Sequence, residues 1–194
     1  MSELSPQVIV IAGPNGAGKT TLAPFLLRDT LGLMEYVNAD HIALGLSGFN
    51  AASVAIEAGR VMLQRLHKLA EQRKTFAFET TLSAKSYVRR IEDMRRDAYN
   101  FQLIFLWLRS VDLAVERVRG RVLAGGHGVA EEVIRRRYFA GLRNFWELYQ
   151  PLADAWSVYD NSGRTPTLIA SGDTEVPLLI YDKGLWISFS FTEP

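Results

Sequence analysis

The sequence predicts a three-layer α/β fold built around a mainly parallel sheet. Short apolar runs alternate with stretches of helical periodicity along most of the chain. Residues 8–12 form a β-branched apolar run followed by glycine, and residues 101–108 (FQLIFLWL) form the most apolar run. Runs of this kind are typical of parallel strands buried on both faces, and their alternation with helices is typical of crossover connections.

The same two patterns give the order of the elements. Between residues 51 and 73, apolar positions recur at the spacing of one helix face. A further helix is expected to start inside a glycine-rich loop and to end near residue 31. The other predicted helices cover residues 83–97, 110–124 and 130–149, and the predicted strands cover residues 8–12, 35–38, 75–78, 101–108, 158–159 and 167–170.

Length and composition predict one globular domain over residues 1–194. The sequence is 48% apolar and 22% charged, and its net charge of +1 gives no reason to expect a nucleic acid or a membrane as partner. Because there is no cysteine, disulfides and thiolate metal sites are excluded. The first residues lack the basic-then-apolar order of a signal peptide, so we expect a cytoplasmic protein.

A glycine-rich loop follows the first predicted strand and precedes a predicted helix. It matches the pattern G-x-x-x-x-G-K-T. The glycines let backbone N–H groups approach phosphate oxygens, Lys19 can bridge the β- and γ-phosphates, and the Thr20 hydroxyl can bind Mg²⁺. The loop therefore predicts a bound nucleoside triphosphate. The predicted nucleotide-binding residues are Gly13, Pro14, Asn15, Gly16, Ala17, Gly18, Lys19, Thr20 and Thr21.

The sequence of this loop is also typical of transporter ATPases, but the rest of the chain excludes an ATPase domain of that kind. A transporter ATPase needs a second signature around LSGG and an apolar strand that ends in Asp-Glu. The partial match Leu46-Ser47-Gly48 comes too soon after the loop and continues with Phe49-Asn50, and no apolar run ends in Asp-Glu.

Two acidic residues follow predicted strands, at the edge where ligands bind in open α/β sheets. Asp40 follows the strand in EYVNADHI, and Glu79 follows the strand in TFAF. Transfer of a phosphoryl group to an alcohol needs a base for the hydroxyl and a held Mg²⁺ ion. Asp40 is therefore our candidate base, and Glu79 is our candidate for orienting the acceptor or a water on the metal. The two assignments could be exchanged.

An arginine-rich segment has the design of a lid. Eight arginines fall between residues 109 and 143, and the run Gly125-Gly126-His127-Gly128 separates two predicted helices. Such a break can act as a hinge while arginines reach the phosphates. Arg117 and Arg121 lie four residues apart on one helix face, and Arg136 lies beyond the break. The lid is expected to span about residues 117–137.

Five segments taken together resemble one family, the zeta-toxin-like P-loop kinases, and most narrowly its stand-alone bacterial branch. They read GPNGAGKTT, VNAD, FAFETTLS, GGHGVAEEVIRRRY and VYDNSG, and they extend over nearly the whole chain. The resemblance implies a P-loop NTPase fold of the NMP-kinase-like type, with strand order 2-3-1-4-5 and a helical lid. It also implies ATP and Mg²⁺ as cofactors and phosphorylation of a hydroxyl on a UDP-amino-sugar such as UDP-N-acetylglucosamine.

The resemblance also implies roles for individual residues and a partner. The metal would be held by Thr20, with Asp40 acting through water, and a small antitoxin-like protein is a possible partner. The implied residues are Asp40 as base, Lys19, Arg121 and Arg136 as further catalytic groups, Glu79, Thr80 and Thr81 at the sugar, and Asn161 in the adenine pocket.

Two other functions stay open at this point. The arginine segment could follow a nucleic-acid backbone, as in a polynucleotide 5′-hydroxyl kinase or an RNA-linked ATPase. Single-strand binding also needs stacking aromatics, and Trp146, Tyr149 and Trp156 are available. Trp146 and Tyr149, however, lie at helical spacing and are expected to pack in the core. The other alternative is a nucleotide-gated binding protein without transfer chemistry.

Overall fold

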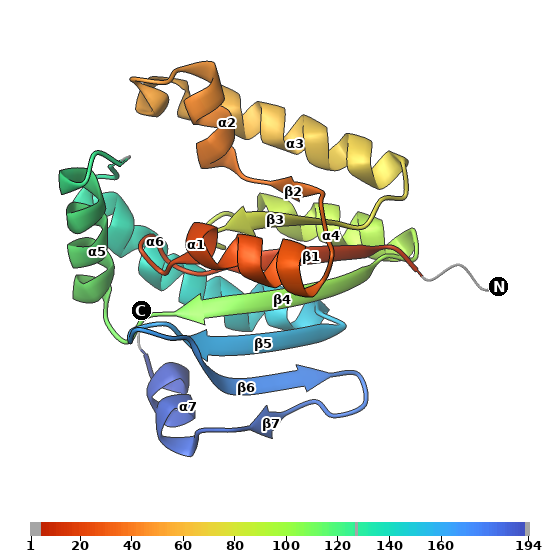
Figure 1. Cartoon of the computed structure of the whole chain (residues 1–194). Helices are drawn as coiled ribbons and strands as arrows, with labels where there is room; N and C mark the ends of the chain where they lie inside the picture. Colours follow the sequence, from red (N-terminus) through yellow and green to blue (C-terminus); the bar gives the residue numbers. More distant parts are fainter. Residues whose placement is uncertain (1–4, 127, 193–194) are drawn as a thin grey trace.

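The computed structural model describes residues 5–126 and 128–192 and shows one sheet with helices around it (Figure 1). Within these residues, the sheet has seven strands in the order β2-β3-β1-β4-β5-β6-β7. The first five strands are mutually parallel, whereas β6 and β7 run antiparallel to their neighbours. The strands are β1 (Gln7–Ala12), β2 (Tyr36–Val37), β3 (Phe76–Thr80), β4 (Asn100–Trp107), β5 (Ala155–Asp160), β6 (Thr167–Asp173) and β7 (Leu179–Ile180).

The predicted fold class is confirmed, and the parallel part of the sheet has the expected order 2-3-1-4-5. The full order differs from the expectation because β6 and β7 extend the sheet beyond β5. Only residues 161–166 separate β5 from β6. A parallel neighbour needs a crossover of about a dozen residues or more, so a connection this short forces an antiparallel pair.

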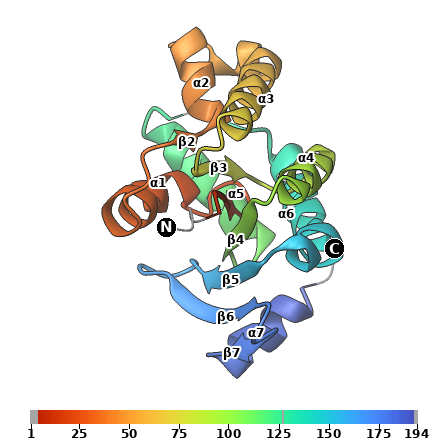
Figure 2. The same ribbon diagram turned by 90° about the vertical axis from the view of Figure 1, so that its right-hand side faces the viewer.

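Helices cover both faces of the sheet (Figure 2). The helix α1 lies on one face, α4 and α6 lie on the other, and α2 and α3 lie beyond β2. The helical elements are α1 (Lys19–Ala23), η1 (Pro24–Thr30), α2 (Ala39–Leu46), η2 (Ala51–Val54), α3 (Ala55–Glu71), α4 (Ser86–Arg96), α5 (Val111–Leu123), α6 (Glu131–Asn144), η3 (Phe145–Tyr149), η4 (Gln150–Leu152) and α7 (Lys183–Ser190). None of the helices in these described residues is long and apolar enough to cross a membrane.

The central strands β1 and β4 form the core, as their apolar runs predicted. Residues 8–12 of β1 are all nearly inaccessible, and so are the last three residues of β4, 105–107. A cluster of aromatic rings continues this core under the antiparallel strands. Phe189 of α7 lies at the centre of this cluster. The centroid of its ring is within 6 Å of the ring centroids of Phe105, Trp107, Phe145, Trp146 and Trp186. The sequence did not predict α7, which begins where the Asp182 side chain accepts a hydrogen bond from the Leu185 N–H.

Replacing Phe189 by alanine tests whether this helix is part of the core. We expect Phe189→Ala to lower the free energy of unfolding by about 3–5 kcal/mol, because a fully buried ring with several aromatic neighbours is removed. Ile187→Ala, on the same helix, should change it by less than about 0.5 kcal/mol, since that side chain is 57% exposed. Urea denaturation measures both, and similar values for the two variants would contradict this packing.

Candidate active site

The glycine-rich loop lies between β1 and α1, at the carboxyl edge of the sheet. At Gly13, where φ is +141°, a Cβ would lie 2.2 Å from the Leu106 carbonyl oxygen of β4, so only glycine permits this approach. At Gly18, where φ is +82°, a Cβ would lie 2.7 Å from Nδ2 of Asn161, at the end of β5. The loop is therefore fixed against two neighbouring strands as well as its own helix.

The Lys19 side chain folds back over this loop. It is only 7% exposed, and its Nζ donates to the carbonyl oxygens of Gly13 (2.9 Å) and Pro14 (2.8 Å). The same Nζ lies 4.0 Å from Oε1 of Glu79. An ammonium group has three donors, so Lys19 can turn toward a phosphate oxygen while one loop carbonyl returns to solvent.

Charges from four places in the chain act on Lys19. Burial lowers the pKa of Lys19, and the positive charges of Arg121 and Arg137 act in the same direction. The negative charges of Glu79 and Asp40 raise this pKa. The two acids and two lid arginines therefore lie near enough to the lysine to form one electrostatic site with it.

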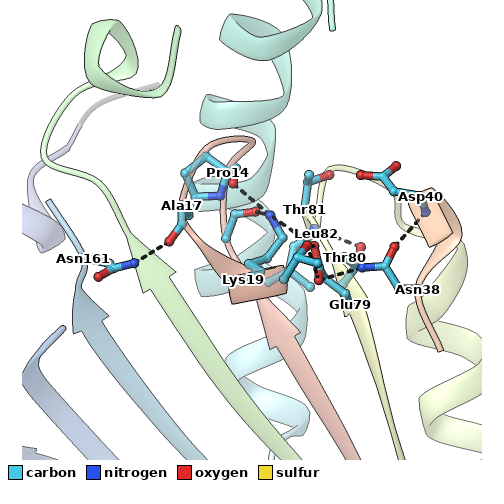
Figure 3. A network of polar contacts seen from close by, with 12 residues as sticks. Pro14, Ala17, Lys19, Asn38, Asp40, Glu79, Thr80, Thr81, Leu82 and Asn161 are labelled. Atoms are coloured by element: carbon cyan, nitrogen blue, oxygen red, sulfur yellow. Dashed lines mark hydrogen bonds and ion pairs between the residues drawn. The ribbon is translucent and has the colours of Figure 1, made fainter. Parts of the chain in front are cut away.

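The Glu79 carboxylate is the centre of a hydrogen-bond network (Figure 3). Both of its oxygens accept from the Thr20 hydroxyl, at 3.1 and 3.0 Å. Oε2 also accepts from the Tyr36 hydroxyl at 2.5 Å and from Nδ2 of Asn38 at 2.8 Å. Glu79 is thus fixed beside the threonine that we predicted as the metal ligand. The position suits the orientation of water on a metal ion, one of the two roles considered for Glu79.

Tyr36 is half-buried, and its hydroxyl acts as a hydrogen-bond donor to Glu79. Burial, followed by the negative charge of Glu79, raises the pKa of Tyr36 well above its usual value. The phenol therefore stays protonated at any ordinary pH and keeps its hydrogen bond to the Glu79 carboxylate.

Asn38 connects this network to Asp40. Its Oδ1 caps helix α2 by accepting from the backbone N–H groups of Asp40 (2.7 Å) and His41 (3.2 Å). Its Nδ2 donates to Glu79, and Asn38 itself is buried. Asp40 is exposed in the first turn of α2, so its carboxylate is open to an acceptor. Its position is nevertheless set by the same side chain that holds Glu79.

The residues present fit a magnesium ion. Mg²⁺ prefers hard oxygen ligands, is usually held by one or two protein groups together with phosphates, and keeps several waters. The exposed Thr20 hydroxyl and the carboxylate that it contacts meet this need. Among the described residues there is no group of three or more His, Cys, Asp or Glu that could hold a metal alone. The donor set therefore suits an ion that arrives with the nucleotide.

The two predicted threonines after Glu79 have different surroundings. Thr80 Oγ1 accepts a hydrogen bond from the Leu82 N–H (3.2 Å), so this hydroxyl supports the local turn. Thr81 Oγ1 instead forms a hydrogen bond with Ser83 Oγ (2.9 Å), and both side chains are only half-buried. Of the two threonines, Thr81 is the better placed to contact an acceptor.

The predicted lid is a helix pair with a break. Helix α5 ends at Leu123 and α6 begins at Glu131, and His127 of the predicted hinge lies outside the described residues. Arg119 and Arg135 both pair with Glu131, and Arg135 also pairs with Asp112. These pairs hold the two helices of the lid together.

The arginines near the phosphate site are only partly those expected. The charge of Arg121, one of the expected lid arginines, acts on Lys19, and so does that of the half-buried Arg137, whereas Arg136 is exposed. Arg117 does not turn toward the phosphates, because it donates to the carbonyl oxygens of Asn161 (2.7 Å) and Ser162 (2.9 Å).

Asn161 is part of a brace on the nucleotide loop. Its Nδ2 donates to the Ala17 carbonyl oxygen at 2.7 Å. The preceding residue, Asp160, is buried and pairs with Arg109. In this structure, the side chain that we expected in the adenine pocket ties the loop to the end of β5.

Sequence reasoning missed three residues of the site, namely Tyr36, Asn38 and Arg137. The sequence contained one signal for Asn38, because an asparagine directly before a helix with an acidic residue in its first turn is a common N-cap. Nothing in the sequence marks Tyr36 or selects Arg137 from three consecutive arginines.

Comparison with known proteins decides the family of this chain. The family model described as Zeta toxin matches residues 1–169. The chain belongs to the zeta toxin family. An uncharacterized protein of Haemophilus influenzae is 30% identical over 132 residues, which is 68% of this chain and 92% of that protein.

Solved structures share the fold of this zeta toxin family member at low sequence identity. The crystal structure of AvrRxo1-ORF1 with AvrRxo1-ORF2 has a TM-score of 0.76 and 14% identity, and covers 96% of this chain. This chain spans only 64% of AvrRxo1-ORF1, which has also been solved with ATP. A chain from the structure of the PezAT toxin–antitoxin system of Streptococcus pneumoniae matches this chain with a TM-score of 0.65 and 16% identity. The match covers 88% of this chain and 73% of the PezAT chain.

Membership of the zeta toxin family confirms the resemblance seen in the sequence. It is consistent with the predicted ATP-dependent phosphotransferase.

Replacing Lys19 tests whether this loop holds the triphosphate. Mg-ATP should raise the Tm of the protein, since a ligand at a hundred times its Kd adds about 2.7 kcal/mol to the free energy of unfolding. Lys19→Met should lose most of this rise because it removes the buried cation of the loop. Lys68→Met, an exposed lysine on α3, should keep it. A full rise in Lys19→Met would show that the triphosphate binds elsewhere.

Proposed function

We propose that the protein transfers the γ-phosphate of ATP to a hydroxyl group of a small acceptor, a UDP-amino-sugar such as UDP-N-acetylglucosamine. The observation that carries the proposal is the connection between the nucleotide loop and an accessible acid. Thr20 contacts Glu79, which contacts Asn38. Asn38 in turn caps the helix that carries Asp40. The phosphate side and the acceptor side of a transfer reaction are thus joined through three hydrogen-bonded groups.

In the proposed reaction, the acceptor oxygen forms a bond to the γ-phosphorus while the bond to the β-phosphate oxygen breaks. Asp40 accepts the proton that the acceptor hydroxyl loses. Lys19 donates to the β- and γ-phosphate oxygens in place of a loop carbonyl. Mg²⁺, held by Thr20, would neutralise charge on the phosphates, with Glu79 and Asp40 acting on its waters.

The lid supplies the remaining positive charge in this proposal. Arg121 approaches the transferring group from α5, and α6 contributes an arginine at its second turn. From the sequence we expected Arg136 in this role. Arg137 is favoured instead, because its charge acts on Lys19. Residues 1–194 would act as one kinase domain, in which residues 117–137 form the lid.

The choice of acceptor and partner rests on the family. The UDP-amino-sugar follows from the zeta-toxin-like resemblance, and the open Asp40 carboxylate and the Thr81–Ser83 hydroxyl pair are groups suited to a sugar. A small antitoxin-like protein is proposed as partner because two similar structures are of AvrRxo1-ORF1 with ORF2 and of a toxin–antitoxin system.

The aromatic residues do not favour the polynucleotide alternative. Tyr149 and Trp156 are buried, and Trp146 packs against Phe145, Trp186 and Phe189. Rings held in this way are not open to stack on single-stranded bases, which is what a strand-binding surface needs.

Replacing Asp40 separates a kinase from a nucleotide-gated binding protein. We expect Asp40→Asn to lower kcat for transfer to UDP-N-acetylglucosamine by about 10²–10⁴-fold, because a general base contributes about this factor. ATP affinity should stay within about twofold. Asp97→Asn, an exposed acid after α4, should have neither effect. Phosphorylated product is followed by mass spectrometry.

Two outcomes of that experiment would count against the proposal. Unchanged transfer in Asp40→Asn would show that Asp40 is not the base. Tight ATP binding without product from UDP-N-acetylglucosamine, other UDP-sugars or free amino sugars would exclude the proposed acceptor class.

Two glycines of the lid form a matched pair that tests Arg121. A Cβ on Gly126 would lie 2.6 Å from Arg121 Cγ and 3.0 Å from its carbonyl oxygen, whereas one on Gly120 meets nothing within 4 Å. Gly126→Ala should displace the arginine and lower kcat about tenfold with little change in ATP affinity. Gly120→Ala should leave kcat unchanged and stabilise the helix by up to about 1 kcal/mol. Equal kcat values in both variants would mean that Arg121 does not act at this position.

A further inference from the structure

The turn that follows β3, residues 81–84, has a strained backbone and packs against α6. Leu82 has a φ of +56° although it is not glycine, and its side chain is fully buried. A residue with a Cβ seldom adopts this conformation, and buried positions of this kind are frequent at functional sites. The other two such residues, Arg73 and Ala98, are exposed. The contacts that hold this turn are therefore a guide to its use.

Helix α6 supplies the contacts on one side of the turn. Nδ2 of Asn144 donates to the Leu82 carbonyl oxygen at 2.7 Å, and Asn144 is only 3% exposed. A Cβ on Gly141 would lie 2.4 Å from the Thr81 carbonyl oxygen, so the helix touches the backbone of the turn directly. A buried amide group is costly unless it is hydrogen-bonded, so Asn144 fixes the turn at a defined distance from the helix.

The turn presents two hydroxyl groups shortly after Glu79 in the chain. Thr81 Oγ1 and Ser83 Oγ lie 2.9 Å apart, and both residues are half-buried. They flank Leu82, so the conformation of that residue sets where both hydroxyls point. Figure 3 shows the Thr81 side chain on the same side of the network as the Asp40 carboxylate. The hydroxyl pair therefore lies on the side from which an acceptor would approach Asp40.

The same face of α6 also carries the arginine of the phosphate side. Arg137, Gly141 and Asn144 have the spacing i, i+4, i+7, which places them on one face of the helix. The charge of Arg137 acts on Lys19, while Gly141 and Asn144 contact the turn. One rigid helix thus fixes the hydroxyl pair relative to a phosphate-side cation.

We propose that Asn144 is a positioning residue for the acceptor. Through its hydrogen bond to the Leu82 carbonyl, it holds the Thr81–Ser83 hydroxyl pair where these groups bind the acceptor and keeps them in register with Arg137. The inference rests on the proposed kinase function, and it adds Asn144 as the residue that holds the Thr81–Ser83 hydroxyl pair in place.

Steady-state kinetics with UDP-N-acetylglucosamine and Mg-ATP test this role. Asn144→Ala should raise the KM for UDP-N-acetylglucosamine about tenfold, the effect of one lost hydrogen bond, and change the KM for ATP less than twofold. In a double-mutant cycle with Thr81→Val, the kcat/KM of the double variant should be no lower than that of the less active single variant, because Asn144 acts through the turn. If the two losses in kcat/KM multiply, Asn144 does not act through Thr81 and the proposal is wrong.

Tyr149→Phe is the matched control for general loosening of the turn. It removes a hydrogen bond from the Tyr149 hydroxyl to the Ala84 carbonyl oxygen, beyond the hydroxyl pair. It should lower the Tm while leaving the acceptor KM within twofold. An equal rise of the acceptor KM in Tyr149→Phe would overturn the specific role of Asn144. Asn144→Ser provides the same comparison if Asn144→Ala does not fold.

Hydrogen exchange keeps this inference separate from the choice of acceptor. If the wild-type protein makes no product from UDP-N-acetylglucosamine, the proposed acceptor is wrong whatever Asn144 does. The positioning role is then decided by the Leu82 amide, which donates to Thr80 Oγ1. Asn144→Ala should speed exchange at this amide at least tenfold and leave the Leu22 amide of α1 unchanged. Unchanged exchange at Leu82 would overturn the role.

Discussion

The carboxylate of Glu79 is the interaction on which the geometry of the site depends. A carboxylate at the end of a central strand is stable there only if its oxygens are hydrogen-bonded, because removing it from water costs several kcal/mol. Glu79 meets this need with donors from three elements, namely Thr20 of α1, Tyr36 of β2 and the Asn38 cap of α2. The nucleotide loop, the edge strand and the helix of the candidate base are held together by one side chain.

A second set of contacts fixes the other side of the nucleotide loop. Asn161 binds the Ala17 carbonyl, and Arg117 binds the carbonyl oxygens that follow β5. The loop is thus held from both sides before any nucleotide binds, which limits the reorganisation that binding requires. In contrast, Asp40 of α2 and Arg136 of the lid are exposed, and these are the parts that an acceptor would have to approach.

The sequence predicted most of the parallel fold because its signals are local. The β-branched run of β1, the loop pattern after it and the apolar run of β4 each identify an element without reference to any other. The C-terminal part was poorly predicted for the opposite reason. The strand β7 has only two residues, which is too short for a sequence pattern. Helix α7 is stabilised by the packing of Phe189 and Trp186 into a cluster built from distant parts of the chain, and such contacts leave no local signal.

The candidate site divides in the same way. The sequence by itself determined the nucleotide loop, Lys19 with Thr20, and the two acids after the strands, since residue type and distance from a strand end are properties of the chain. Only the tertiary structure decided which arginine of α6 lies near enough to Lys19 for its charge to act there. Successive helical residues point about 100° apart, and the buried face of α6, with Ile134, Tyr138 and Leu142, determines how this helix is turned. The pairing of Asn38 with Glu79 was decided there too, because two residues 41 positions apart meet only when β2 and β3 lie side by side.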